Sequence, residues 1–265
     1  MAPIIVLITG ANRGIGRGLL ELYLARANHT VIAAVRDPNH PTAKELTEIP
    51  RAEDTSLVVV KLDLTVPSDP AAAVHDLSAK YALDHIDILI ANAGIALKWV
   101  KVSEVTTQDI QQHVDVNIHG FVRLFQIFLP VLQKAKDPKW VTIGSSAAFL
   151  TVNPVLCRSD LSISVRSHNR NFLPMKNAAY APTKLVQHWL TKAIHTEEPW
   201  LTAFPVDPGW VQTDMGQRGA YAFGYDKAAI TVNESVTGII SVIDAATRKT
   251  HSGKLWVYTG NESPW

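Results

Sequence analysis

Short apolar runs alternate with longer amphipathic segments along this 265-residue chain. The runs have strand length: residues 3–9, 30–35, 57–61, 87–91, 140–143, 201–206 and 254–258. The segments between them repeat apolar residues at helical spacing, over residues 14–27, 107–132, 183–195 and 235–247. Strands that are apolar on both faces and separated by helices predict an α/β fold, with one doubly wound parallel sheet covered by helices on both faces.

The charge balance and the single cysteine limit the classes of function. The chain carries 25 Lys and Arg against 24 Asp and Glu, a net charge of +1, so we expect neither a nucleic-acid nor an anionic-membrane partner. Cys157 alone cannot form an internal disulfide, which favours a reducing, cytoplasmic location. We see no signal peptide, no apolar stretch near membrane-spanning length, no internal repeat and no linker. We therefore expect a single domain over residues 1–265.

One segment interrupts the alternation. Residues 150–177 have no strand or helix periodicity. Loops of this length without secondary structure are uncommon inside a compact domain. The segment is either a functional lid, a disordered insertion or a piece foreign to the fold, such as an intron read as protein.

A glycine-rich loop lies between the first strand and the first helix. Gly10 allows a tight turn, Gly14 lets the backbone approach a pyrophosphate, and Gly16 permits close packing of helix on strand. The free N–H groups at the start of the helix would face the phosphates. In this position the loop predicts a Rossmann-type dinucleotide site, whereas a lone glycine pattern would be weak evidence.

The end of the second strand selects the nucleotide. Sites for NAD usually carry an acidic residue there, but this strand ends at Val35 and is followed by Arg36. Arg13 lies within the glycine loop, and two guanidinium groups favour a ribose 2′-phosphate. We therefore predict NADP(H); the alternative is that Arg36 pairs with Asp37 on the surface.

Several motifs occur together in the order typical of one family. Beyond the glycine loop they are Asp63, Asn92-Ala93-Gly94, Asn117, Ser145, Tyr180 with Lys184, Pro208-Gly209 and Thr213. With these motifs the chain resembles the short-chain dehydrogenase/reductase family over nearly its whole length. Residues 195–215 and 258–265 look like fungal ketoreductases of the norsolorinic-acid type, which reduce ketones on aromatic polyketides.

The resemblance implies a catalytic set. Tyr180 would be the general acid in ketone reduction, with its pKa lowered by Lys184 and the oxidised nicotinamide. Lys184 would also hold the nicotinamide ribose, and Ser145 would bind the substrate carbonyl, with Ser146 as the alternative. Asn117 would hold a water that links Lys184 to solvent.

The resemblance also implies a cofactor-binding set and a wider site. Asp63 would meet the adenine, Asn92 would support the cofactor, and Thr213 with the backbone around Val211 would meet the carboxamide. The full set is Gly10, Asn12, Arg13, Gly14, Ile15, Gly16, Arg36, Asp63, Leu64, Asn92, Ala93, Gly94, Tyr180, Lys184, Pro208, Gly209, Val211 and Thr213. Five aromatic residues are candidates for a substrate pocket or for ordinary packing: Trp99, Phe149, Trp210, Tyr221 and Phe223. The ten histidines form no HExxH or Cys/His cluster, so we predict no metal.

Two features depart from the family pattern. Pro182 lies between Tyr180 and Lys184, so we expect a helix that begins near Ala181 and leaves Tyr180 at its very end. The interval from Ser145 to Tyr180 is 180 − 145 = 35 positions, where the family has about a dozen, and the excess falls within residues 150–177. An insertion there is placed to cover the substrate or to disturb Tyr180.

The leading expectation is an NADP(H)-dependent reductase of a small-molecule ketone. The alternatives are an imine reductase or alcohol dehydrogenase on the same scaffold, or a cofactor-binding protein without turnover. The resemblance also implies a homodimer or homotetramer formed through the long helices. Phe121, Phe125 and Phe128 suit either that interface or the core.

Overall fold

The strands that the structure describes form one sheet. The structure is a computed structural model that describes residues 2–150 and 176–265. The strands are β1 (Ile4–Thr9), β2 (His29–Val35), β3 (Ser56–Lys61), β4 (Ile88–Ala91), β5 (Lys139–Ile143), β6 (Thr202–Asp207), β7 (Leu255–Val257) and β8 (Glu262–Ser263). Their order is β3-β2-β1-β4-β5-β6-β7-β8, and only β7 and β8 pair antiparallel. The chain winds outward in both directions from β1, which confirms the predicted doubly wound sheet.

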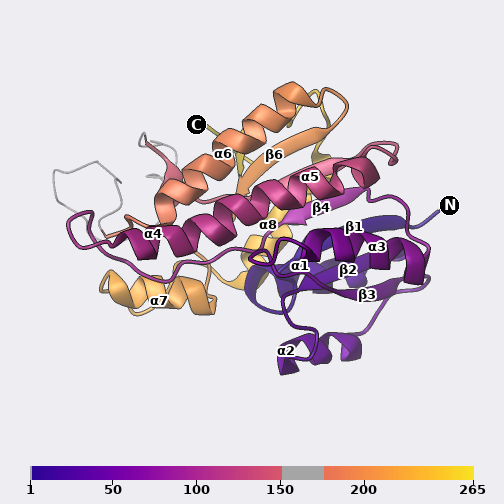
Figure 1. Ribbon diagram of the computed structural model, residues 1–265, viewed down its shortest axis with the longest axis horizontal. Coiled ribbons are helices and arrows are strands. Elements are labelled where there is room, and N and C mark those ends of the chain that lie inside the picture. Colours follow the sequence, from indigo (N-terminus) through magenta and orange to yellow (C-terminus); the bar gives the residue numbers. More distant parts are fainter. Residues whose placement is uncertain (1, 151–175) are drawn as a thin grey trace.

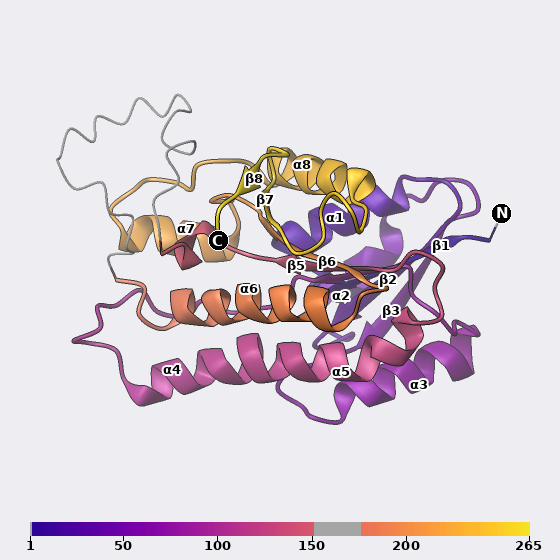
Figure 2. The same ribbon diagram turned by 90° about the horizontal axis from the view of Figure 1, so that it is seen from above.

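Helices cover both faces of this sheet (Figures 1 and 2). Figure 2 shows α1 (Gly14–Leu24) and α8 (Val232–Ala245) on one face. The other face carries α3 (Asp69–Tyr81), α6 (Tyr180–Glu197) and one long helix. That long helix consists of α4 (Thr107–Val114), a π-helix, η2 (Asp115–Gly120), and α5 (Phe121–Leu132). The remaining elements are α2 (Pro41–Lys44), α7 (Asp214–Ala222) and two 3₁₀ turns, η1 (Glu45–Glu48) and η3 (Ser146–Ala148).

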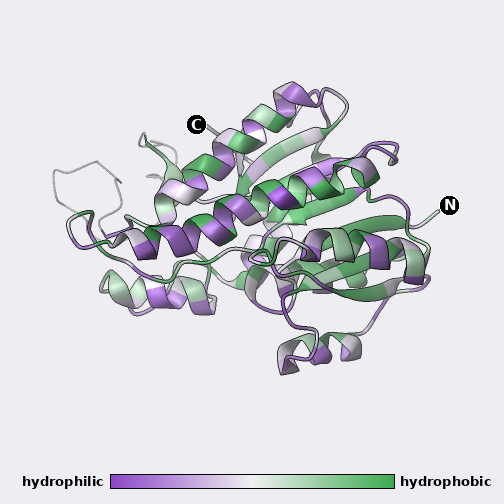
Figure 3. Ribbon diagram, in the orientation of Figure 1, coloured by the Kyte–Doolittle hydropathy of each residue, from purple (hydrophilic) through white to green (hydrophobic). Residues whose placement is uncertain are grey.

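The central strands contribute side chains to two apolar cores, one on each face of the sheet. Along β1, Val6 and Ile8 belong to the core under α1 and α8, whereas Ile5 and Leu7 belong to the opposite core. Figure 3 shows the strands as the most apolar part of the chain and the helices as striped. Burial on both faces explains why the strands read as continuous apolar runs.

The three phenylalanines of α5 turn toward the sheet. Phe121 and Phe128 are buried in the core, at 3% and 0% exposure. Phe125 packs edge-on against Trp140 of β5, with ring centroids 5.1 Å apart. These side chains therefore contribute to the core, which settles their assignment between core and interface.

The described helices differ from the sequence expectation in three places. The predicted helix over residues 107–132 is present, but the π-helix interrupts it around Asn117. Helices α2, α3 and α7 and the short strand β8 were not predicted; α2 and β8 are very short, and α3 consists mostly of alanine and polar residues. Helix α6 begins at Tyr180, and Pro182 fits within its first turn.

The helix over Thr107–Leu132 is long and apolar enough to cross a membrane by length and composition, which we did not expect from the sequence. Core helices pass the same test, and this helix packs Phe121, Leu124, Phe128 and Leu132 into the core.

Apart from Leu150, Lys176 and Asn177, the predicted irregular segment 150–177 lies outside the described residues.

Candidate active site

The glycine loop has the close backbone approach that its sequence predicted. Gly10 and Gly14 have φ of 66° and 55°, in the left-handed region that favours glycine. A Cβ on Gly16 would lie 2.3 Å from the carbonyl oxygen of Gly10, so helix α1 starts directly against the turn. Only hydrogen fits at that position.

The N-terminus of α1 presents uncapped backbone donors. Its N-cap, Arg13, makes no side-chain capping bond, whereas Thr213 and Thr231 cap α7 and α8. Uncapped N–H groups next to a glycine cradle are the donor set that a pyrophosphate takes. The residues present therefore fit a dinucleotide, and Ile15 contributes one of these first-turn positions.

The end of β4 supports this loop from beside it. Thr9 accepts hydrogen bonds at Oγ1 from the backbone N–H groups of Asn92 (3.0 Å) and Ala93 (2.9 Å). The Asn92 amide donates to the Thr9 carbonyl at 2.8 Å. A Cβ on Gly10 would lie 3.2 Å from Cα of Ala93, so these two strand ends touch.

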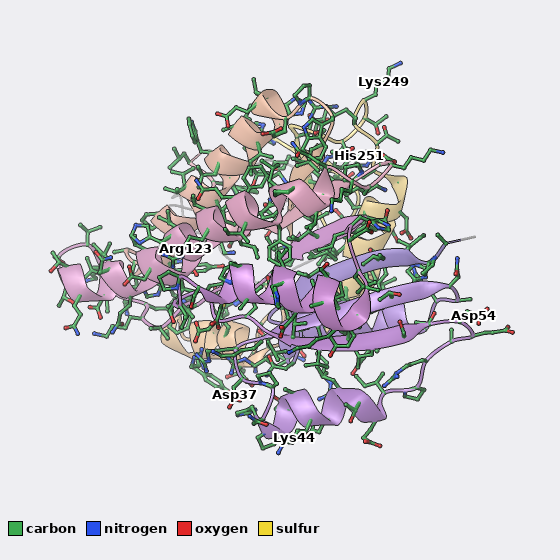
Figure 4. The ribbon with its side chains drawn as sticks, turned by 45° about the vertical axis from the view of Figure 1, so that its right-hand side comes forward. Asp37, Lys44, Asp54, Arg123, Lys249 and His251 are labelled. Carbon is green, nitrogen blue, oxygen red and sulfur yellow. The ribbon has the colours of Figure 1, made fainter. Side chains whose placement is uncertain are left out.

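Two arginines are exposed where the adenosine ribose is expected. Neither Arg13 nor Arg36 enters an ion pair among the described residues, and Asp37 instead accepts from the backbone of Asn39. The alternative that Arg36 pairs with Asp37 therefore has no support in the described geometry. Figure 4 shows Asp37 close to α2.

Two other predicted cofactor residues near this end, Asn12 and Asp63, are held by hydrogen bonds. Asn12 donates to Thr42 Oγ1 at 2.7 Å, which ties the glycine loop to α2. Asp63 accepts from the backbone and hydroxyl of Thr65 at 2.9 and 2.7 Å.

The carbonyl of Leu64 accepts from Arg123 of α5 at 2.7 Å, and Figure 4 labels this arginine on the long helix. A Cβ on Gly120 would lie 2.6 Å from Cβ of Leu64. Leu64 is therefore fixed against the junction of the π-helix and α5.

The loop after β6 closes the site from the other side of the glycine loop. A Cβ on Gly14 would lie 3.1 Å from the Thr213 methyl, so the two loops face each other. Gly209 has φ of 75°, and the Pro208 carbonyl accepts from Ser235 of α8 at 2.7 Å. Val211 forms an isolated parallel bridge to Ile230, which holds the loop in place.

Tyr180 and Ser145 form a hydrogen-bonded pair between the start of α6 and the end of β5. Burial raises the pKa of Tyr180 to about 12; the hydrogen bond from Ser145 opposes this rise, and the Asp207 carboxylate adds to it. The Lys184 ammonium is not among the causes of this shift, and its effect on the Tyr180 pKa together with the bound cofactor stays a prediction. Lys184 Nζ lies 5.9 Å from the Tyr180 ring centroid, and its hydrogen bonds go elsewhere.

The two neighbouring serines point to different partners. Ser145 hydrogen-bonds Tyr180, and its Oγ accepts from the backbone of Ala147 at 3.2 Å. Ser146 donates its backbone N–H to Asp207 at 2.9 Å, and its hydroxyl also bonds that carboxylate. Only Ser145 therefore shares its hydroxyl with Tyr180.

Lys184 is buried beside the π-helix. Its Nζ donates to the Ile143 carbonyl and to Gln187 Oε1, both at 2.8 Å. Burial lowers its pKa to about 8. A Cβ on Gly94 would lie 3.1 Å from Asn117 Oδ1 and 3.8 Å from Lys184 Nζ, so Gly94 lies against both side chains.

Asn117 is fully buried, and its side chain is used by the neighbouring loop. Oδ1 accepts from the backbone of Ile95 at 2.9 Å, and Nδ2 donates to the Ile95 carbonyl and to Thr183 Oγ1, both at 3.0 Å. Its backbone carbonyl accepts from Gln187 Nε2 at 2.6 Å. The contact toward Lys184 thus runs through Gln187.

Three polar residues of the site were missed in the sequence. Gln187 and His188 lie one turn beyond Lys184, a helical spacing that signals a shared face. His188 Nε2 accepts from the Ser145 backbone at 3.2 Å, and burial, with Lys184 nearby, lowers its pKa to about 3. Asp207 directly precedes the Pro208-Gly209 motif, and burial raises its pKa.

The candidate aromatic residues do not form one cluster. Trp210 contacts Phe223 and Tyr225 edge-on, with centroids 6.2 and 5.3 Å apart. Trp99 lies against Gly219 of α7, and Tyr221 on the same helix is exposed. Phe149 instead contacts the ring of His188. Within residues 2–150 and 176–265, no three His, Cys, Asp or Glu side chains gather as metal ligands would.

Comparisons with known proteins found related sequences and related folds. Residues 4–156 match the sequence model described as short chain dehydrogenase. The norsolorinic acid ketoreductase of Dothistroma septosporum is 38% identical, over 98% of this chain and 91% of that protein. That of Aspergillus parasiticus is 36% identical with the same two coverages. Among solved structures, an NADPH-bound carbonyl reductase from chicken fatty liver is 29% identical, with a TM-score of 0.79 and full coverage of both chains.

Proposed function

The chain belongs to the short-chain dehydrogenase family, which makes it an oxidoreductase, and we propose that it reduces a ketone to an alcohol with NADPH. The observation that carries the proposal is the Ser145–Tyr180 hydrogen bond beside buried Lys184. These groups come from the ends of β5 and α6, next to the glycine loop. Ligands bind at the carboxyl ends of strands in folds of this type.

The chemistry follows from the protonation states of these side chains. When bound, NADPH supplies the hydride to the carbonyl carbon. Tyr180, with a pKa near 12, stays protonated at neutral pH and donates its phenolic proton to the carbonyl oxygen. Ser145 donates a hydrogen bond to the same oxygen and stabilises the negative charge that develops there. Lys184 holds the nicotinamide ribose.

The preference for NADPH over NADH is assigned to Arg13 and Arg36. Both are exposed at the ribose end of the loop, and among the described ion pairs neither is already used. Guanidinium groups pair with phosphate through two parallel hydrogen bonds. The similar chicken carbonyl reductase is described as NADPH-bound, which supports the same choice here.

An aromatic, polyketide-derived ketone is the substrate that we infer. The relatives from Dothistroma and Aspergillus are named for norsolorinic acid. Trp210 and Phe223 lie in and after the loop that carries Pro208-Gly209 and Thr213, so flat apolar surface borders the cofactor loop. Aromatic rings bind flat ligands through stacked or edge-on contacts.

We further infer a homodimer or homotetramer. Helix α6 exposes Leu185 and Trp189, one turn apart, at 36% and 67%. Light scattering after gel filtration measures the mass, and a monomer at micromolar concentration would remove this inference.

Removal of the Tyr180 hydroxyl tests the proposed reaction. We expect Tyr180→Phe to lower kcat on an aromatic ketone by about 10²–10⁴-fold, because the proton donor is lost. NADPH affinity, measured by fluorescence titration, should stay within about twofold, because the phosphates bind elsewhere.

Tyr81→Phe is the matched control, since Tyr81 is exposed at the end of α3 and belongs to no part of the site. It should leave kcat unchanged. Full turnover by Tyr180→Phe would overturn the mechanism, and failure of the native protein to bind either nucleotide would overturn the function.

A further inference from the structure

The ammonium of Lys184 is fixed by two acceptors. It is 4% exposed, and two of its three N–H groups donate to the Ile143 carbonyl and to Gln187 Oε1. Both distances are 2.8 Å, short enough for charge-assisted hydrogen bonds. One N–H group is left to act toward the site.

Gln187 contacts two groups of opposite character at once. Its Oε1 accepts from the Lys184 ammonium, and its Nε2 donates to the Asn117 carbonyl at 2.6 Å. An ammonium only donates and a carbonyl only accepts, so the orientation of the amide is determined by its neighbours. Gln187 is 1% exposed, and a buried amide with both ends bonded is held rigidly.

The carbonyl that anchors Gln187 belongs to the π-helix. Asn117 lies within Asp115–Gly120, where the backbone follows the i→i+5 hydrogen-bond pattern of a π-helix rather than that of an α-helix. The Asn117 side chain bonds Ile95 and, on α6, Thr183, which leaves its backbone carbonyl as the acceptor for Gln187.

We propose that Gln187 is a positioning residue for Lys184 and that its carboxamide is the direct bridge between Asn117 and the ammonium. The resemblance implies a water between Asn117 and Lys184 that leads to solvent, whereas Gln187 joins the two residues directly and is buried. The proposal rests on the proposed function, because the position of Lys184 matters for holding the nicotinamide ribose. A carboxamide in this orientation holds the ammonium without itself gaining or losing a proton.

The titration of Lys184 measures this bridge directly. The titratable groups near the ammonium are Tyr180 and His188 on α6, and the Asp207 carboxylate at the end of β6 acts in turn on Tyr180. Burial places the pKa of Lys184 at about 8, within a measurable range. Its Cε signal in protein labelled with ¹³C-lysine, assigned with Lys184→Arg, reports the midpoint without cofactor or substrate.

Two substitutions that should shift the Lys184 midpoint in opposite directions test the proposal. Gln187→Met removes the acceptor and should lower the Lys184 midpoint by about one pH unit or more, because a hydrogen bond to the charged form is lost. Gln187→Glu adds a carboxylate at the same place and should raise the midpoint by about one unit or more. In the active enzyme, the alkaline limb of the kcat profile should move in the same two directions.

Thr191→Val is the matched control. Thr191 lies one turn further along α6, is fully buried, and bonds Thr142 and the Gln187 backbone at 2.7 Å. Its loss should lower stability and leave the Lys184 midpoint unchanged. If Gln187→Met does not fold, the upward shift in Gln187→Glu decides the question.

An unchanged Lys184 midpoint in folded Gln187 variants would overturn the proposal, as would equal shifts in Thr191→Val. The two claims also fail separately. A native protein that turns over no ketone removes the proposed function, while the lysine titration still reports the Gln187 bridge.

Discussion

At the scale of single residues, charge and burial oppose each other throughout the site. Lys184 and His188 are buried bases, and burial lowers the pKa of each. Tyr180 and Asp207 are buried acids, and burial raises theirs. Each shift favours the neutral form, so the site costs stability in order to hold these groups in a place with little water.

Lys184 gives a pH dependence with a defined sign. Its pKa falls from 10.5 to about 8, so the unfolded chain holds the proton more tightly than the folded protein. Burial of the charged ammonium lowers the free energy of unfolding by its full amount below pH 8, and this loss becomes smaller as the pH rises toward 10.5. Relative to Lys184→Met, the native protein should therefore gain about 1.4 kcal/mol per pH unit above pH 8.

Urea unfolding of both proteins at pH 7, 8, 9 and 10 measures this difference. The Tyr180 phenol, with its pKa near 12, stays protonated in the folded state of both proteins over this range. Parallel stability curves for the two proteins would show that Lys184 is not buried as a charge.

Arg36 provides the test of nucleotide choice. We expect Arg36→Asp to raise the KM for NADPH by about 10–100-fold, because an attractive charge becomes a repulsive one beside the 2′-phosphate. The KM for NADH should stay the same or fall. Steady-state kinetics with both nucleotides measures the ratio.

Arg51→Asp serves as the control for a change of net charge, since Arg51 is exposed on the loop before β3 and bonds the Thr47 carbonyl. An equal loss of affinity for NADH and NADPH in Arg36→Asp would remove the assignment to the 2′-phosphate.

The sequence predicted which residues form the site far better than it predicted their hydrogen-bond partners. The glycines, Ser145, Tyr180 and Lys184 belong to motifs of fixed spacing, and the chemistry of a phosphate cradle or a proton donor restricts the choice of residue. Gln187 belongs to no motif, and its role depends on the Asn117 carbonyl 70 positions earlier in the chain. Contacts of that kind follow from the packing of α6 on the π-helix, which the sequence pattern does not contain.

At the scale of secondary structure, α6 carries most of the polar contacts of the site. Within about two and a half turns it supplies Tyr180, Thr183, Lys184, Gln187 and His188. Residues three and four apart share a helix face, so one rigid element positions the proton donor, the ammonium and its bridge. Pro182 in the first turn sets the start of this helix where no backbone donor is required.

The contact between β5 and α6 allows a prediction at this scale. A Cβ on Gly144 would lie 2.5 Å from His188 Nε2, which is itself buried and bonded to the Ser145 backbone. Gly144→Ala should therefore displace Ser145, lower kcat by about tenfold or more, and cost about 1–3 kcal/mol of stability by overpacking. Chemical denaturation and steady-state kinetics measure the two effects.

The double variant Gly144→Ala/His188→Ala checks the cause. Truncation of the imidazole removes the clash, so the alanine at position 144 should cost less in that background. Equal costs in both backgrounds would mean that the loss arises elsewhere.

Strands with buried faces on both sides were predictable, and short or weakly patterned elements were not. The runs in β1 and β2 are apolar at every central position because both faces are covered. Helix α3 is mostly alanine and polar residues with only Ala73, Leu77 and Pro70 apolar and buried, so its sequence carries little periodic signal. The π-helix at Asn117 leaves no mark in an apolar stripe.

At the scale of the whole molecule, the site is assembled from distant parts of the chain. The glycine loop follows β1, the Asn92 motif follows β4, Ser145 follows β5, and Thr213 lies beyond β6. These strands are neighbours only in the finished sheet, where β1 pairs with β4 about 80 positions later. The alternation of strands and helices predicted a doubly wound parallel sheet, whereas the strand order and the register come from the structure.

The strand order has a consequence for how the activity first arises during synthesis. A nascent chain that has reached β4 can already pair β1, β2 and β3, but it lacks the strands that bring in Ser145, Tyr180 and Thr213. Parallel pairings between distant segments form slowly, because the loops between them must close first. The groups proposed to act on the substrate can therefore come together only after β5, α6 and β6 have joined the fold.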